Sequence, residues 1–216
     1  MKDISSDFSG EMHWDRIHSV SEDSLSWNEN NKYSTLDLII SCARNREDIV
    51  ADIGCGQNGI IIPLLKMGYK RMLAIDVSKK ALDNLTAKVS SIDRQHCVTL
   101  INRNILDIGN LIPDNYVKVW HDRFTFHFLV DTDHMEKYIC LAQKKTVNGG
   151  HIVLTTYADS GPETCSGLPV RRYNHNSLFS LFRHEFELLS YRYADHVTPE
   201  GSVKPYVSVV LRKKHD

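Results

Sequence analysis

The sequence has no long hydrophobic run and no excess of charge of one sign. Lys and Arg number 26 and Asp and Glu 27 in 216 residues, so the formal net charge is −1. The longest apolar stretches, such as LDLIISCA at 36–43, are much shorter than the roughly 20 residues that cross a bilayer. We therefore expect no membrane-spanning segment, and no nucleic-acid binding driven by bulk positive charge.

Cysteine is scarce and scattered, and the first residues lack the pattern of a secretion signal. An odd number of cysteines without a CxxC pair favours neither a disulfide framework nor a metal site, so we expect none. Residues 1–15 contain acids where a signal peptide needs a basic and then an apolar segment. Free thiols favour a reducing compartment, so the sequence predicts a cytoplasmic location. The cysteines are Cys42, Cys55, Cys97, Cys140 and Cys165.

What the chain does contain is an alternation of apolar strand-like runs with helical patterns. The pattern predicts strands at 49–54, 71–76, 97–101, 117–122 and 151–157. It predicts helices at 35–44, 61–68, 81–89, 133–146 and 177–184, with Ser34 and Ser78 as N-caps and Asn148-Gly149-Gly150 ending the fourth. A loop is predicted at 158–176, and the runs at 186–194 and 206–212 predict an antiparallel pair. Such alternation is typical of an α/β fold with a parallel sheet covered on both faces.

The N-terminal segment differs from the rest of the chain. Residues 1–33 are polar and acidic but contain Trp14 and Trp27. Because tryptophan is costly to leave in water, we expect this extension to fold back as a lid, with a short helix around Trp14. Residues 34–216 are then a single domain.

The predicted strand ends gather the polar residues of the chain. In a parallel sheet, ligands bind beyond the carboxyl ends of the strands. The segments at these ends are Asp52–Asn58, Asp76–Ser78, Asn102–Asp107 and His121–Arg123. Function is expected at this edge.

The first of these segments contains a glycine motif. Gly54, Gly56 and Gly59 form GxGxxG after a predicted strand, and Asp76 ends the next strand, placed to accept hydrogen bonds from a ribose diol. A nicotinamide-dependent dehydrogenase fits this motif by itself. Asp52, however, would sit poorly beside a pyrophosphate, and no second domain remains for a dehydrogenase substrate. An adenosine ligand with an amino group and no phosphate, S-adenosylmethionine, fits better.

Longer strings carry a family resemblance. Val50-Ala-Asp-Ile-Gly-Cys-Gly and Ala74-Ile-Asp-Val-Ser resemble the first two signatures of class I S-adenosylmethionine-dependent methyltransferases. The strings WHDRFTFHFL at 120–129 and GPETCSGLPV at 161–170 resemble a bacterial subgroup of these enzymes, as does the element HWDRIH at 13–18. The resemblance covers residues 10 to 211. It departs from the subgroup at His18, where a tyrosine is usual, and at Asn104, where an acid is usual near the adenine.

The resemblance implies a fold, a cofactor and a set of cofactor-binding residues. The expected fold is a doubly wound, seven-stranded, mostly parallel sheet with an antiparallel last strand. The expected cofactor is S-adenosyl-L-methionine, with S-adenosyl-L-homocysteine as its product. The residues expected to bind it are Trp14, Asp52, Gly54, Gly56, Asp76, Val77, Asn104, Ile105 and Trp120.

The acceptor side is predicted from the fourth strand end and the loop after the fifth strand. Asp122 and His121 are the expected catalytic residues, facing the transferred methyl group. The alternative is an Asp122–Arg123 salt bridge with His121 capping a loop, and His127 is expected to be packed rather than catalytic. The expected substrate-binding residues are Arg123, Cys165, Arg171, Arg172 and Tyr173.

Three functions remain open on the sequence. The leading one is methylation of a small molecule, because the predicted pocket-closing elements are short. A thiol or related chalcogen is attractive as acceptor, since its low pKa makes a strong base unnecessary. The alternatives are a protein lysine methyltransferase, with Asp122 in an acidic groove, and a non-catalytic cofactor-binding subunit that serves a partner. The oligomeric state is left open.

Overall fold

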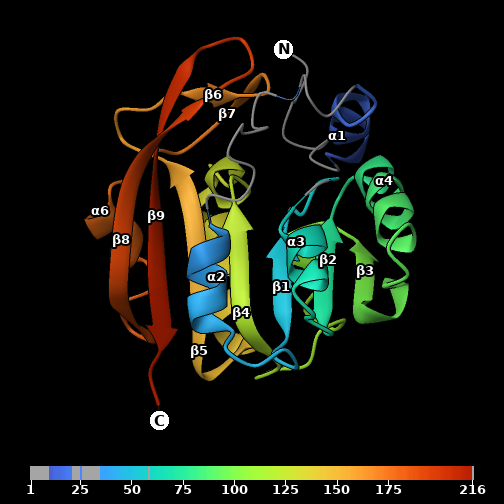
Figure 1. The fold of residues 1–216 in the computed structure, drawn as a ribbon. Coiled ribbons are helices and arrows are strands. Elements are labelled where there is room, and N and C mark those ends of the chain that lie inside the picture. Colours follow the sequence, from blue (N-terminus) through green and yellow to red (C-terminus); the bar gives the residue numbers. More distant parts are fainter. Residues whose placement is uncertain (1–9, 21–24, 26–34, 58, 216) are drawn as a thin grey trace.

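A seven-stranded sheet with helices on both faces forms the centre of the molecule (Figure 1). The computed structural model describes residues 10–20, 25, 35–57 and 59–215. The strand order is β3-β2-β1-β4-β5-β9-β8, in which β9 runs antiparallel between β5 and β8 and the neighbours from β3 to β5 pair in parallel. The strands are β1 Val50–Ile53, β2 Met72–Asp76, β3 Val98–Asn102, β4 Val117–Arg123, β5 Thr146–Tyr157, β8 Phe186–Val197 and β9 Val203–Lys213. The predicted doubly wound sheet with an antiparallel last strand is confirmed.

The helices and short turns connect these strands. The α-helices are α1 Glu11–Ile17, α2 Leu36–Cys42, α3 Ile61–Lys66, α4 Lys79–Ser90, α5 Thr132–Lys145 and α6 His175–Ser180. Three 3-10 turns are η3 Gln95–Cys97, η4 Ile105–Asp107 and η5 Phe126–Phe128, and β6 Thr164–Cys165 pairs with β7 Leu168–Pro169 in a separate hairpin. That hairpin lies inside the segment predicted as a loop.

Two apolar layers hold the helices on the sheet. Leu64 of α3 and Leu85 of α4 are fully buried on the face that α2, α3 and α4 cover. Tyr138 of α5 and Leu178 of α6 are fully buried on the opposite face. Strands β1 and β2 are buried at every position. A strand covered on both faces has no solvent side, which explains why IVADI and MLAID read as continuous apolar runs.

The helix starts follow from their caps. Ser78 caps α4 as predicted, because its hydroxyl accepts a hydrogen bond from Ala81 N at 3.0 Å. Helix α2 begins one residue later than predicted, with Thr35 at the N-cap position. Ser34, the predicted cap, lies outside the described residues, as does Trp27.

The end of α5 differs from the prediction. The helix passes directly into β5 at Thr146, which is buried and pairs with Val117 of β4. The register then jumps to Val119 opposite His151, so residues 147–150 leave the ladder. Asn148-Gly149-Gly150 therefore does not end the helix but forms an irregularity within β5, where Gly149 has a φ of +68°.

No helix within the described residues combines the length and the apolar character needed to cross a membrane.

Candidate functional site

The carboxyl ends of the parallel strands meet at one edge of the sheet. Strands β1, β2, β4 and β5 all point to this edge, and α1 and the β6–β7 hairpin lie beyond it (Figure 1). The strand order reverses at β1, because β2 and β3 lie on one side of it and β4 and β5 on the other. Such a reversal creates the usual ligand crevice of these folds.

The glycine turn after β1 is tightly packed. Gly54 and Gly56 have φ values of +62° and +58°, a region that favours glycine. A Cβ atom at Gly54 would lie 1.9 Å from Oγ1 of Thr125, a residue that in turn donates to the Ile53 carbonyl at 3.1 Å. The turn therefore lies directly against the segment after β4.

Asp76 stands at the end of β2, facing the glycine turn. Its two carboxylate oxygens accept hydrogen bonds from the backbone N–H groups of Gly56 and Ser78, each at 2.8 Å. Burial raises the pKa of Asp76 to about 6, although the two N–H donors act in the opposite direction. Asn102 donates to the Val77 carbonyl at 2.8 Å and so orients the chain after the aspartate.

The residues predicted near the adenine lie after β3. The Asn104 side chain accepts a hydrogen bond from Leu106 N at 3.0 Å and caps η4 with its oxygen. Ile105 is buried, and Val77 is half-buried at the neighbouring strand end. The Asn104 oxygen therefore has a local structural role as the cap of η4.

Asp52 and His121 form a buried pair across β1 and β4. The two residues are in register on neighbouring strands, and His121 Nδ1 lies 2.7 Å from Asp52 Oδ1. The other ring nitrogen is 2.9 Å from the Thr35 hydroxyl, and all three side chains are nearly inaccessible to solvent. Asp52 Oδ2 is buried and has no hydrogen-bond partner among the described residues.

Asp122 is completely buried on the opposite face of β4. One oxygen accepts from the backbone N–H groups of Thr125 and Phe126, at 2.9 and 3.1 Å, and the other from the Tyr138 hydroxyl at 2.7 Å. Burial raises its pKa to about 6.

Tyr138 also accepts a hydrogen bond from Trp120 Nε1 at 2.9 Å. The predicted cofactor contact of the Trp120 indole is therefore corrected: that ring lies in the core beneath α5, with no exposed surface. The alternative Asp122–Arg123 ion pair is likewise replaced by this network.

Aromatic side chains gather on the other side of the site, beyond β4 and β5. We use the name aromatic cluster for five buried residues, namely Phe124, His127, Tyr157, Cys165 and Tyr206. The Tyr157 hydroxyl donates to the Cys165 thiol at 3.3 Å. Phe128 is half-buried at the cluster's margin, and the Arg123 guanidinium lies 4.6 Å from the Phe124 ring centre. Arg123 and Cys165, two of the residues predicted to bind the substrate, thus both lie at the aromatic cluster.

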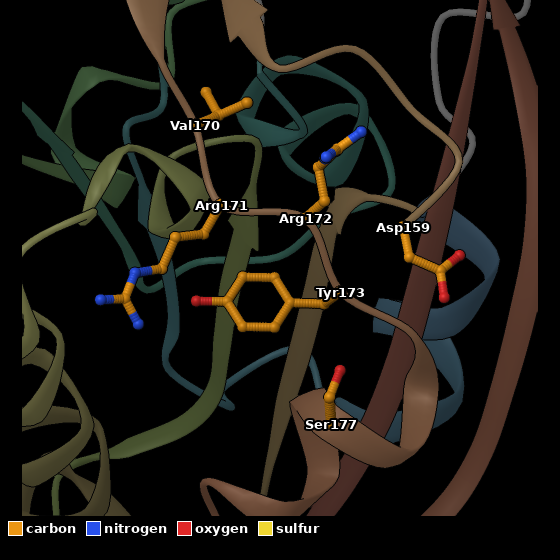
Figure 2. Close-up of a pocket in the computed structure, with 6 residues that line it drawn as sticks. All are labelled: Asp159, Val170, Arg171, Arg172, Tyr173 and Ser177. Carbon is orange, nitrogen blue, oxygen red and sulfur yellow. The ribbon is translucent and has the colours of Figure 1, made fainter.

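Arg171, Arg172 and Tyr173 line a shallow cavity of about 450 Å³ with Asp159, Val170 and Ser177 (Figure 2). The two guanidinium groups point away from each other (Figure 2). Arg171 donates to the Val130 carbonyl and the Thr132 hydroxyl, whereas Arg172 pairs with Glu163 at 2.9 Å. The arginines therefore fix the loop from 158 to 173 through these contacts, and their guanidinium groups do not converge on one anion.

Helix α1 bridges the two sides of the site. Asp15 accepts hydrogen bonds from the Ser78 hydroxyl at 2.6 Å and from Lys80 N at 3.0 Å, at the start of α4. Trp14 packs edge-on against Phe128, with ring centres 5.1 Å apart. His18 is buried, and a Cβ atom at Gly56 would lie 3.4 Å from its ring. Burial lowers the pKa of His18 to about 4, so its imidazole is neutral at pH 7.

Several contributors were missed by sequence reasoning. Thr125 donates a hydrogen bond to the Ile53 carbonyl before the glycine turn, and Tyr138 donates one to Asp122. The Thr35 hydroxyl is hydrogen-bonded to His121. The alternation of residues along β4 could have placed Asp122 and His121 on opposite faces. No sequence signal could have found Thr35, since it is 86 residues from His121.

The comparisons with known proteins agree with this geometry. Residues 51–154 match the family model described as a methyltransferase domain. No curated protein matches the chain. Among solved structures, a Burkholderia thailandensis 1,6-didemethyltoxoflavin-N1-methyltransferase with bound S-adenosylhomocysteine superposes with a TM-score of 0.75 at 14% identity, over 96% of this chain and 89% of that one.

Two further structures share the fold at the same identity. The N-methyltransferase NodS from Bradyrhizobium japonicum WM9, in complex with S-adenosyl-L-homocysteine, superposes with a TM-score of 0.73. The match covers 96% of this chain and 100% of that one. A structure described as the conversion of a disulfide bond into a thioacetal group during echinomycin biosynthesis also has a TM-score of 0.73, over 94% of this chain and 92% of that one. Both are 14% identical to this chain.

The side chains present fit S-adenosylmethionine. The unpartnered Asp52 Oδ2 suits a positively charged amino group, and the Asp76 carboxylate, fixed by two backbone N–H groups, can accept from a ribose diol. The positive φ values of Gly54 and Gly56 allow a ligand to approach the backbone between these carboxylates. The methyltransferase domain matched over residues 51–154, the shared fold and this donor set support an S-adenosylmethionine-dependent methyltransferase.

Proposed function

We propose that the enzyme methylates a small molecule at a soft nucleophile, such as a thiol or a related chalcogen. The observation that carries the proposal is the make-up of the aromatic cluster, which consists of four aromatic rings and one thiol. Such apolar rings would desolvate an apolar acceptor, and they offer little to a charged polymer segment. A thiol ionises near neutral pH and is an intrinsically strong nucleophile, so the site needs only to orient it.

The protein's own residues bind, align and exclude water. When bound, S-adenosylmethionine supplies a methyl group on a positively charged sulfur, which the acceptor displaces in line. The residues proposed to hold it are Trp14, Asp52, Gly54, Gly56, Asp76, Val77, Asn104 and Ile105. The acceptor thiol loses its proton to water as the new carbon–sulfur bond forms.

His121 and Asp122 act as positioning residues in this proposal. His121 orients Asp52 through their 2.7 Å contact, and Asp122 holds the start of η5 through its two backbone donors. Because both Asp122 oxygens are occupied and the side chain is fully buried, it is poorly suited to accept a proton from an acceptor. Arg123, Cys165, Arg171, Arg172 and Tyr173 form the outer wall around the acceptor.

Residues 1–33 act as a lid in this proposal. Within the described part, α1 is anchored beside Asp76 through Asp15 and over the aromatic cluster's margin through Trp14. A single helix thus contacts both the cofactor half and the acceptor half. Its closure would exclude water from both.

One of the three structural relatives concerns sulfur chemistry. The echinomycin structure concerns a disulfide that becomes a thioacetal, whereas the toxoflavin and NodS structures concern N-methyltransferases. A protein lysine methyltransferase is less well supported, because Asp122, the carboxylate expected to receive a lysine, is inaccessible.

A methyl-transfer assay distinguishes these possibilities. Radiolabelled S-adenosylmethionine is incubated with a panel of thiols, amines and phenols, and in parallel with protein extracts, with Asp76→Ala as the matched inactive control. We expect label in a small-molecule thiol. Label in protein lysine would support a protein lysine methyltransferase. Label in a small-molecule amine alone would overturn the choice of sulfur as the accepting atom. Cofactor binding without transfer to any acceptor would support a non-catalytic subunit.

A further inference from the structure

His127 is a buried imidazole whose polar atoms are not used by the protein. Its side chain has no exposed surface, and neither Nδ1 nor Nε2 has a hydrogen-bond partner among residues 10–20, 25, 35–57 and 59–215. Buried polar groups are nearly always paired, because an unpaired one loses its hydration without compensation. His127 therefore destabilises the isolated fold, which is typical of a group whose partner arrives with a ligand.

The surroundings of His127 are apolar rings. Phe124 stacks on the imidazole with ring centres 5.6 Å apart and planes 24° apart, and Tyr157 and Phe128 approach to 4.8 and 4.5 Å. The Tyr157 hydroxyl is already bonded to Cys165. A water molecule bound to His127 would find few of the two to four polar partners that buried waters need.

His127 lies between the glycine turn, on the cofactor side of the site, and the loop that contains Arg171, on the proposed acceptor side. Thr125, two residues earlier, contacts Gly54 of the glycine turn, and the His127 carbonyl accepts from Arg171 N at 2.8 Å. Phe124 has a φ of +66°, which is strained for an aromatic residue. Such strain concentrates at functional sites, where the surrounding structure holds a residue in place for a ligand.

We propose that His127 is an acceptor-binding residue, whose imidazole hydrogen-bonds a neutral polar group of a flat, uncharged small molecule that lies against Phe124, Phe128 and Tyr157. The inference rests on the proposed small-molecule function and narrows its substrate class. Phe128 is half-buried under Trp14, so a displacement of these two rings opens the way to His127.

The imidazole acts by recognition and not as a base. Burial lowers the pKa of His127 to about 3, so the ring is neutral at pH 7 and offers one N–H donor and one acceptor nitrogen. A neutral group on the acceptor matches this pair better than an ion, because the cluster would desolvate a charge without compensating it.

The test uses the full-length chain and a pair of matched probes, thiophenol and 4-mercaptophenol, which differ by one neutral hydroxyl. In the wild type we expect a higher kcat/KM for 4-mercaptophenol. His127→Phe should lower that kcat/KM about tenfold, the effect of one hydrogen bond, and remove the preference between the probes. Affinity for S-adenosylhomocysteine should stay within about twofold, and His127→Asn should retain part of the preference.

Stability and spectroscopy separate this role from simple packing. His127→Phe should raise the midpoint of thermal unfolding, because it removes an unpaired buried polar group, whereas His134→Phe on the exposed face of α5 should not. The imidazole signals of His127 in histidine-labelled protein should shift when 4-mercaptophenol is added with S-adenosylhomocysteine. If His127→Phe is less stable yet keeps the preference for 4-mercaptophenol, or if no imidazole shift occurs, the inference is overturned.

The same experiment distinguishes failure of the proposed function. An imidazole shift with 4-mercaptophenol, but no methylation of either thiol by the wild type, would refute the thiol acceptor while supporting His127 as a binding residue. Methylation of both probes that His127→Phe leaves unchanged would support the function and refute the inference.

Discussion

Two groups of buried residues at the same sheet edge are built in opposite ways. Asp76 and Asp122 are buried carboxylates, and both oxygens of each accept hydrogen bonds from the chain itself. His127 is an equally buried polar side chain that receives no hydrogen bond from the described residues. The carboxylates are thus pre-organised by the protein, whereas the imidazole stays incomplete until a ligand arrives. In the proposed function, Asp76 belongs to the cofactor site and His127 to the acceptor site.

The largest effect is expected from removing a completed carboxylate. Asp122→Ala leaves the Tyr138 hydroxyl and two backbone N–H groups buried without an acceptor. Each unpaired group costs about 1–3 kcal/mol, so urea denaturation should show a loss of at least about 3 kcal/mol in the free energy of unfolding. Asp131→Ala, which removes one exposed helix cap, should cost only about 1 kcal/mol.

The conservative change at the same position keeps the shape. Asp122→Asn should lower methyl transfer but leave cofactor affinity within about threefold, because η5 shifts and the glycine turn does not. An Asp122→Ala protein as stable as the wild type would contradict the idea that the protein pre-organises this carboxylate.

The glycine turn gives the next largest effect. Gly54→Ala must place a Cβ atom 1.9 Å from Thr125 Oγ1 at a φ of +62°, which we expect to cost about 2–3 kcal/mol of stability, as for other overpacked sites. Gly167→Ala is a matched control, because its φ is +78° but nothing lies within 4 Å of the added Cβ. The control should lose only about 1 kcal/mol. Equal losses would show that the backbone conformation alone matters and not the contact with Thr125.

Cofactor affinity should depend on Asp76. Asp76→Ala removes the proposed acceptor for a ribose diol and should weaken S-adenosylhomocysteine binding by about 1.5–3 kcal/mol, the range for hydrogen bonds to a charged group. Isothermal calorimetry measures this directly, and NAD serves as the negative control ligand. Unchanged affinity in the variant, or binding of NAD, would contradict the assigned cofactor site.

The same carboxylate predicts a pH dependence. The pKa of Asp76 is raised to about 6 by burial, so its ionised fraction falls about tenfold between pH 7 and pH 5. If the ionised form accepts from the diol, affinity should be constant above pH 7 and weaken about tenfold by pH 5, or about 1.4 kcal/mol. Asp76→Asn should bind more weakly but with a flat profile. A wild-type profile that is flat from pH 7 to 5 would refute this role.

The smallest effect should come from the anchor of α1. Asp15→Ala removes hydrogen bonds to the Ser78 hydroxyl and Lys80 N, which we expect to cost about 0.5–1 kcal/mol. Limited proteolysis should then cut faster within residues 10–20, and S-adenosylhomocysteine should bind up to about fivefold more weakly. Glu11→Ala on the exposed side of α1 is the control. Unchanged proteolysis and affinity would show that α1 is not a lid.

The local features of the chain could be read without the structure. The apolar runs at β1 and β2, the cap at Ser78 and the glycines at 54 and 56 depend only on neighbours along the sequence, so their patterns predicted elements that the structure confirms. The end of α5 was predicted wrongly, because the pairing of Thr146 with Val117 on a distant strand overrides the glycine pair that follows.

The surroundings of the polar residues at the end of β4 were decided by the tertiary structure. His121 and Asp122 are adjacent in sequence, yet strand alternation sends them to opposite faces, where Thr35 and Tyr138 meet them. Trp120 reaches the core for the same reason. Periodicity thus predicted the sheet, the glycine motif with Asp52 and Asp76 predicted the cofactor turn, and the resemblance of the longer strings implied the class of chemistry. Which buried groups are paired and which, like His127, wait for a ligand depends on contacts between residues far apart in the chain, and only folding brings those together.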